Sequence, residues 1–139
     1  MSAENKAIVD RLTQAFNEGN LDLLDELVAP EFVGHSPLSP EPIQGPEGLK
    51  GFFGAFRAAM PDITHPGWTL IAEGDLVAIH MPIEGTFRNE LMGIPPNGKK
   101  VSLWMCNVWK VVGGKALEWW IHMDTLSLMQ QLGVVPPLG

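Results

Sequence analysis

The sequence has little cysteine and little positive charge. Its single cysteine, Cys106, cannot form an internal disulfide, and no pair of cysteines offers a structural metal site. Nine lysine and arginine residues against sixteen aspartate and glutamate residues give a formal net charge of -7. We therefore expect no binding to nucleic acid and no polybasic contact with a membrane surface, because both need basic patches.

The sequence also lacks long hydrophobic runs. No segment approaches the roughly eighteen apolar residues of a membrane span, and the polar N-terminus does not read as a signal peptide. These features favour the reducing cytoplasm. The composition, with 45% hydrophobic and 18% charged residues over 139 positions, is that of one globular domain covering residues 1–139.

The first half of the sequence reads as mostly helical. Apolar residues recur at helical spacing over residues 3–18, 21–28 and 47–60. Pro30 is expected to close the second helix, and Pro46 stands at a typical first helical position of the third. The segment 47–60 carries one apolar stripe, which is typical of a helix lying on a core.

The second half reads as strands joined by short glycine-rich turns. The expected strands cover 67–72, 76–87, 99–112 and 116–123, after a short strand at 31–35 and before a final helix at 125–132. Short connections favour antiparallel pairing. Pro82 predicts an edge strand or a bulge. Helices followed by strands predict an α+β fold, in which a curved sheet closes around the long helix and leaves an apolar pocket.

Three segments carry a family resemblance. They are GHSPLSPEPIQGPEGLKGFFGAFRAAMPDI at 34–63, GTFRNELMGIPPNGKKV at 85–101 and GGKALEWWIHMDTLSLMQQLGV at 113–134. In this order they resemble the SnoaL-like polyketide cyclase and ester cyclase family, over roughly residues 4–134. The resemblance implies a cone-shaped, nuclear-transport-factor-2-like fold.

It also implies a chemistry. Family members close a ring of a polyketide ester by aldol condensation, without metal or organic cofactor, and an aspartate acts as general acid and base. The match places that role on Asp124. The sequence departs from the family pattern at Phe87, where the family has histidine, and at Asn89, where it has glycine. These departures leave the substrate open.

Strand alternation groups further candidates with Asp124. In residues 116–124 the face shared with Asp124 also carries Trp120 and His122. We expect His122 to orient Asp124 and His35, before the proline-rich loop, to contact substrate. Asp124 could equally be the N-cap of the final helix. The opposite face, with Trp119, Ile121 and Met123, would suit a partner subunit in a homodimer.

Other residues are candidates for binding substrate. Asn107 is a polar residue in an apolar row and could hold a substrate oxygen or make a structural hydrogen bond. The candidate pocket lining consists of Trp104, Met105, Trp120, Phe53, Phe56 and Trp68. We read Cys106 as a buried apolar residue, His80 as a surface residue and His65 as solvated. The four histidines lack metal-ligand spacing, so we expect no metal site.

Three functions fit these observations. The first is an enzyme that moves protons on a small hydrophobic carbonyl substrate, by cyclisation, isomerisation or hydration. The second is a binding protein of the same fold without turnover. The third is a small assembly module whose sheet face dimerises. An epoxide-hydrolase-like member is a further alternative, but it would need a second inward-facing acid that the sequence does not reveal. A homodimer or higher homo-oligomer is compatible with each.

Overall fold

We analysed a computed structural model, which describes residues 2–136. Its helices are α1 (Ser2–Glu18), the short 3-10 helix η1 (Leu21–Leu23), α2 (Leu24–Leu27), α3 (Gly45–Ala59) and α4 (Thr125–Gln131). Its strands are β1 (Val28–His35), β2 (Ile43–Gln44), β3 (Thr69–Glu73), β4 (Leu76–Thr86), β5 (Lys100–Val112) and β6 (Lys115–Trp120). The α+β class predicted from the sequence is confirmed.

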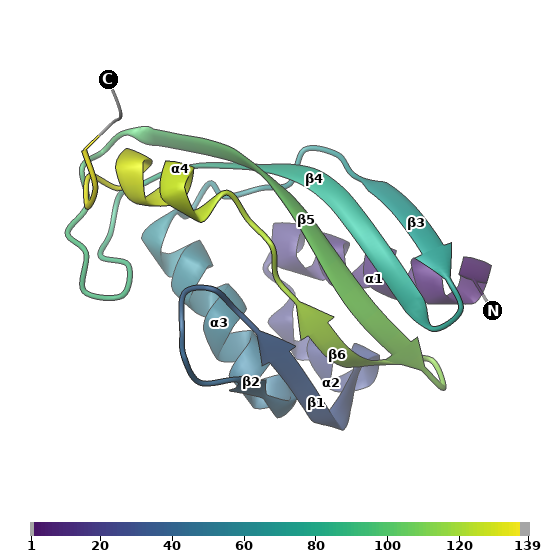
Figure 1. Ribbon diagram of the computed structural model, residues 1–139. Helices are drawn as coiled ribbons and strands as arrows, with labels where there is room; N and C mark the ends of the chain where they lie inside the picture. The colour runs from purple at the N-terminus through teal and green to yellow at the C-terminus, as the bar shows by residue number, and fades with distance from the viewer. Residues whose placement is uncertain (1, 137–139) are drawn as a thin grey trace.

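One six-stranded sheet organises the molecule, in the order β2-β1-β6-β5-β4-β3. Strands β3 to β6 pair antiparallel with their sequence neighbours, as the short turns predict. Strand β1 instead pairs parallel with β6, which the turns could not predict. The sheet is curved and does not close into a barrel, and its long strands β4 and β5 bend over the helices (Figure 1).

Two prolines lie inside strands of the sheet. Pro30 lies inside β1 and does not follow a helix; the register of β1 against β6 shifts between Val28 and Val33, which leaves room for a residue without an N–H. Pro82 lies in β4, an interior strand, yet β3 has already ended opposite His80. The missing N–H of Pro82 therefore faces a gap in the sheet, as at an edge.

The core lies between the concave face of the sheet and helices α1 and α3. On β5 the buried residues alternate with exposed ones, so that Leu103, Met105, Asn107 and Trp109 point inward. The same alternation on β4 turns Val77, Ile79 and Met81 inward. Helices α1 and α3 supply the facing apolar side chains, among them Leu12, Phe16, Phe53 and Phe56.

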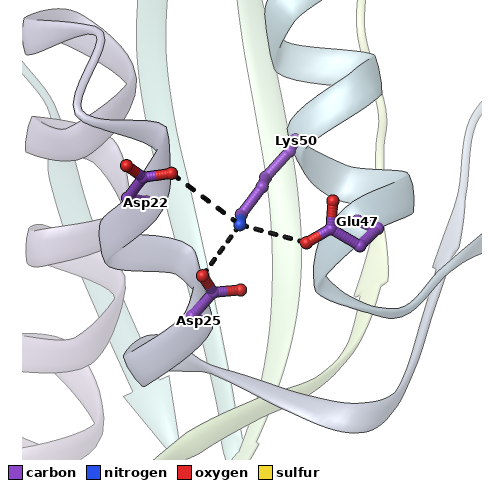
Figure 2. Close-up of polar contacts among 4 residues, drawn as sticks. All are labelled: Asp22, Asp25, Glu47 and Lys50. Carbon is purple, nitrogen blue, oxygen red and sulfur yellow. Dashed lines mark hydrogen bonds and ion pairs between the residues drawn. The ribbon is translucent and has the colours of Figure 1, made fainter.

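The helices are joined to one another on the outside by one lysine. Lys50 of α3 reaches Asp25 of α2 at 2.8 Å, Glu47 at 3.1 Å and Asp22 at 3.9 Å. Figure 2 shows the ammonium group between the three carboxylates. The hydrogen bonds that Lys50 donates to Asp25 and Glu47 raise the pKa of Lys50. The carboxylates are exposed, so we regard this cluster as a guide for helix placement and not as a large source of stability.

Candidate functional site

An apolar cavity lies under the sheet, between α1, α3 and the inner face of β4, β5 and β6. Its volume is about 60 Å³. Helices α1 and α3 line it with Leu12, Thr13, Phe16, Phe52, Phe53, Phe56 and Met60. The sheet and the loops line it chiefly with Met81, Leu103, Met105, Asn107, Trp109, Trp119, Met123 and His65. An apolar cavity with a few polar groups is typical of a ligand-binding site, so this cavity is the candidate site.

Asn107 is the most buried of these polar residues, with 0% exposure. Its Oδ1 accepts a hydrogen bond from the backbone N–H of His122 at 3.0 Å, so the structural bond considered from the sequence exists. Its Nδ2 has no hydrogen-bond partner among the residues that the structure describes. A buried amide donor without an acceptor is rare in proteins and is costly to leave unpaired. The Nδ2 group is therefore suited to an oxygen acceptor on a ligand.

Trp119 supplies a second donor of the same kind. It is 3% exposed and lines the cavity, and its indole Nε1 is also buried without a partner within residues 2–136. The ring is held in place by stacking on Trp109, with centroids 4.4 Å apart, and by edge contact with Phe53 at 5.8 Å. Such rigid packing fixes where the N–H points before any ligand arrives.

His65 is the one histidine within residues 2–136 that lines the cavity, and the prediction that it is solvated is wrong. It is 6% exposed. Its Nδ1 lies 3.0 Å from the carbonyl oxygen of Pro82, in the gap left where β3 ends. Burial lowers the pKa of His65, because the imidazolium form loses its hydration there, and the bond to Pro82 opposes this only in part. The ring is therefore neutral at physiological pH.

Asp124 lies outside the cavity wall. It is exposed and is the N-cap of α4, where its Oδ1 accepts a hydrogen bond from the N–H of Ser127 at 3.1 Å. The capping role considered from the sequence is confirmed. Its neighbour Met123 lines the cavity, so the carboxylate stands beside the site and not within it. Its acid/base role stays a prediction.

The other residues grouped with Asp124 lie on the convex face. His122 is exposed, and Trp120 is half-buried and stacks on the exposed ring of His35, with centroids 5.9 Å apart. The Nε2 of His35 lies 2.7 Å from Glu118. The structure thus brings Trp120, His35 and Glu118 together, away from the cavity. Conversely Trp119, Ile121 and Met123, proposed as a partner surface, point inward and are not available for one.

The substrate-binding candidates divide in the same way. Phe53, Phe56, Met105 and Asn107 line the cavity. Trp104 is 58% exposed and stacks on His80, with centroids 4.8 Å apart on the convex face.

Two further side chains lie away from the cavity. Trp68 is half-buried and donates from Nε1 to Asp10 at 2.9 Å. Cys106 is exposed, which contradicts its reading as buried, because it shares the outward row with Trp104.

A second hollow lies beside α4. The loop between β4 and β5 contributes Leu91, Met92 and Ile94 to it, α4 contributes Leu128 and Met129, and Leu132 follows at the end of that helix. Within residues 2–136 no helix is long and apolar enough to cross a membrane. The same residues hold no group of three or more histidine, cysteine or acidic side chains arranged to bind a metal ion.

The sequence matches the family model of the SnoaL-like polyketide cyclases over residues 6–132. It is 25% identical to nogalonic acid methyl ester cyclase of Streptomyces nogalater, over 88% of this chain and 92% of that protein. It is also 25% identical to the aklanonic acid methyl ester cyclase DauD of a Streptomyces species, over 91% of this chain and 80% of that protein. These relatives are named for ring closure of methyl esters.

Solved structures agree on the fold. IdmH from Streptomyces antibioticus, proposed to be a polyketide cyclase, superposes with a TM-score of 0.77 at 33% identity, covering 94% of this chain and 99% of its own. AclR from Streptomyces galilaeus, proposed to be a hydroxylase, superposes with a TM-score of 0.85 at 26% identity, covering 100% of this chain and 87% of its own. One fold thus carries more than one proposed chemistry among these proteins.

Proposed function

Because this chain belongs to the SnoaL-like polyketide cyclase family, we propose that it is a cyclase-type enzyme that binds a hydrophobic carbonyl compound in the cavity beneath the sheet. The observation that carries the proposal is the pair of unpartnered donors, Asn107 Nδ2 and Trp119 Nε1, on a mostly apolar wall. A carbonyl oxygen accepts hydrogen bonds, and it becomes a stronger acceptor when negative charge develops on it as an enolate or alkoxide.

The substrate class that we propose is a polyketide acid methyl ester or a smaller aromatic ketone. Phenylalanine and tryptophan rings line the cavity, and such rings pack well against flat aromatic ligands. The open volume is small, about 60 Å³, so a ligand of several rings would need side chains such as Phe52 to move. The proposed aldol ring closure joins two carbons of one molecule and conserves its mass.

The first experiment tests for a product that has the same mass as its substrate. The protein is incubated with nogalonic or aklanonic acid methyl ester in buffer containing EDTA, and the products are separated by chromatography and mass spectrometry. We expect a product with the mass of the substrate and a shorter retention time. It should accumulate over many turnovers, with no dependence on added metal or organic cofactor. Quenching of tryptophan fluorescence without any product would favour the binding protein that performs no chemistry.

A matched pair of variants tests the donors. Trp119→Phe removes the indole N–H and keeps an aromatic ring in the core, whereas Trp120→Phe makes the same change on the convex face. We expect Trp119→Phe to lower kcat about 10- to 100-fold, within the range for loss of one preorganised donor. Trp120→Phe should leave kcat unchanged. Equal effects of the two variants on kcat would contradict the proposed role of the Trp119 N–H as a donor to the substrate.

The family resemblance makes Asp124 a candidate for the general acid and base. Asp124→Asn keeps an N-cap, because asparagine caps helices as well as aspartate does, but it removes the carboxylate. Loss of turnover in this variant with unchanged thermal stability would place acid/base chemistry on Asp124. Retained turnover would assign it to the cap alone.

We also propose that the chain forms a homodimer through the convex face of its sheet. Exposed Trp104 lies there, stacked on His80, and large aromatic side chains are enriched at protein interfaces. Light scattering coupled to size exclusion should give twice the mass of the chain, and Trp104→Lys should lower it to a single copy. A single-copy mass for the wild-type protein would exclude this proposal.

A further inference from the structure

We propose that His65 is the proton acceptor of the cavity, and that it receives the proton of a bound ligand through Nε2. This inference rests on the proposed function, because it assumes that a carbonyl compound or its enol occupies the cavity. His65 is the one histidine among residues 2–136 that lines the cavity.

The position of His65 is fixed by its backbone. Its N–H donates to Asn17 Oδ1 at 2.8 Å, and its carbonyl oxygen accepts from Asn17 Nδ2 at 2.8 Å. This reciprocal pair fastens the loop before β3 to the end of α1. The imidazole ring packs on Phe16, with centroids 5.0 Å apart. A ring held in this way presents the same edge to the cavity in every molecule, as preorganised catalysis requires.

The contact with Pro82 determines the tautomer. Nδ1 lies 3.0 Å from the Pro82 carbonyl oxygen, and a carbonyl oxygen can only accept a hydrogen bond. Nδ1 therefore carries the proton. In the neutral ring Nε2 then holds a free lone pair, and no group within residues 2–136 donates to it. A neutral imidazole with a free Nε2 is a base, and burial keeps the ring neutral by lowering the pKa of His65.

The proton balance of the step is simple. The C–H bond next to a carbonyl breaks, its proton goes to Nε2, and its electron pair forms an enolate whose oxygen accepts from Asn107 and Trp119. The enolate carbon then bonds to a second carbonyl of the same molecule, and the resulting alkoxide takes the proton back from Nε2. No oxidant or co-reactant is consumed. Glu84 is the other titratable residue among residues 2–136 that lines the cavity; its side chain is 36% exposed and lies 3.8 Å from Lys100 Nζ.

A purely structural His65 would do no more than satisfy the Pro82 carbonyl, and the test separates the two roles. His65→Asn can still donate to that carbonyl through its amide nitrogen, but it has no group at the position of Nε2. The probes are 2-naphthol, whose hydroxyl can donate to a free Nε2, and 2-methoxynaphthalene, which cannot donate. Binding of both is measured through tryptophan fluorescence.

We expect the wild-type protein to prefer 2-naphthol roughly 3- to 10-fold, the value of one net hydrogen bond, and His65→Asn to lose the preference. A preference that survives in His65→Asn, or that is absent from the wild type, overturns the role of His65. Trp119→Phe is the control for a change in the cavity wall that leaves His65 intact. If neither probe binds the wild type while the protein is folded, it is the proposed function that fails.

Turnover gives the second readout. With whichever methyl ester the wild-type protein converts, His65→Asn should lower kcat about 100-fold or more, in the range for loss of a general base, and leave the affinity for substrate unchanged. Unchanged kcat in His65→Asn, beside a lowered kcat in Trp119→Phe, would retain the cavity and reject His65. Unfolding temperatures of both variants confirm that the comparison is made between folded proteins.

Discussion

Trp119 and Trp120 are neighbours in β6, yet they belong to different environments. Trp119 is 3% exposed, stacks on Trp109 and faces the cavity. Trp120 is half-buried and stacks on His35 on the convex face. The concave face holds unpartnered donors in an apolar setting, while the convex face holds histidines beside tryptophans. The difference shows that residue type alone does not mark a site, because both faces of this sheet are rich in aromatic and polar side chains.

The largest effect that we expect comes from truncating one tryptophan on each face. Trp119→Ala should destabilise the protein by about 3–5 kcal/mol, because it leaves a large void in a packed aromatic cluster. Trp104→Ala should change stability by less than about 0.5 kcal/mol, because that ring is mostly exposed. Urea unfolding measures both. Similar losses would mean that the convex face is also covered, by a second copy of the chain.

Asn107 and Cys106 provide the next comparison, since they are consecutive on β5 and face opposite ways. Asn107→Leu should cost about 1–3 kcal/mol, because the N–H of His122 loses its acceptor in a partly buried place. Cys106→Ser should be close to neutral, because its side chain is exposed. Thermal unfolding of the two variants provides the measurement. A neutral Asn107→Leu would indicate that water replaces the amide.

A smaller effect concerns the cap of α4. Asp124→Ala should cost about 1 kcal/mol, because the N–H of Ser127 loses its acceptor, and Asp124→Asn should cost only a few tenths. Equilibrium unfolding followed by circular dichroism distinguishes these values. A large loss of stability in both variants would show that the Asp124 carboxylate has a structural partner besides the cap. It would then contradict the placement of Asp124 outside the buried face.

The smallest effect is a dependence of stability on pH, and it comes from the buried side. The pKa of His65 is lowered in the folded state. As the pH falls through about 6.5, His65 therefore becomes protonated in the unfolded chain but stays neutral in the folded chain. Stability therefore falls as the pH drops below about 6.5, and His65 contributes no such change at higher pH. Urea titrations at pH 7.5 and 5.5 should show a steeper loss for the wild type than for His65→Asn.

Periodicity in the sequence predicted most of the elements, because helices and strands repeat their apolar residues at different spacings. It could also sort Trp119 from Trp120, since alternate residues of a strand point to opposite faces. It could not say which of the two faces is inside. That choice depends on where α1 and α3 pack, which is a contact between distant parts of the chain. Accordingly Phe53, Phe56, Met105 and Asn107 line the cavity, whereas Trp104 and Trp120 lie outside it, and no sequence pattern separates the two groups.

His65 shows a second limit of the sequence. A histidine before a proline, in a loop, reads as solvated. Its burial follows from the end of β3 opposite His80, which leaves the Pro82 carbonyl open for its ring, and from the pair of bonds with Asn17. Neither contact has a local signal. An unusual Pro82 inside an otherwise regular strand was the one available sign that a neighbouring group completes the sheet there.

The parallel pairing of β1 with β6 has a consequence for the order of folding. His35 and Glu118, which meet across these strands, are 83 positions apart in the chain, whereas β3 to β6 pair with strands that follow one another in the chain. Contacts so distant form slowly, because the intervening chain must first be brought together. We expect the antiparallel strands to assemble first, during or after synthesis, and β1 with its helices to dock last. Pulsed hydrogen exchange would show protection arising in β4 and β5 before β1.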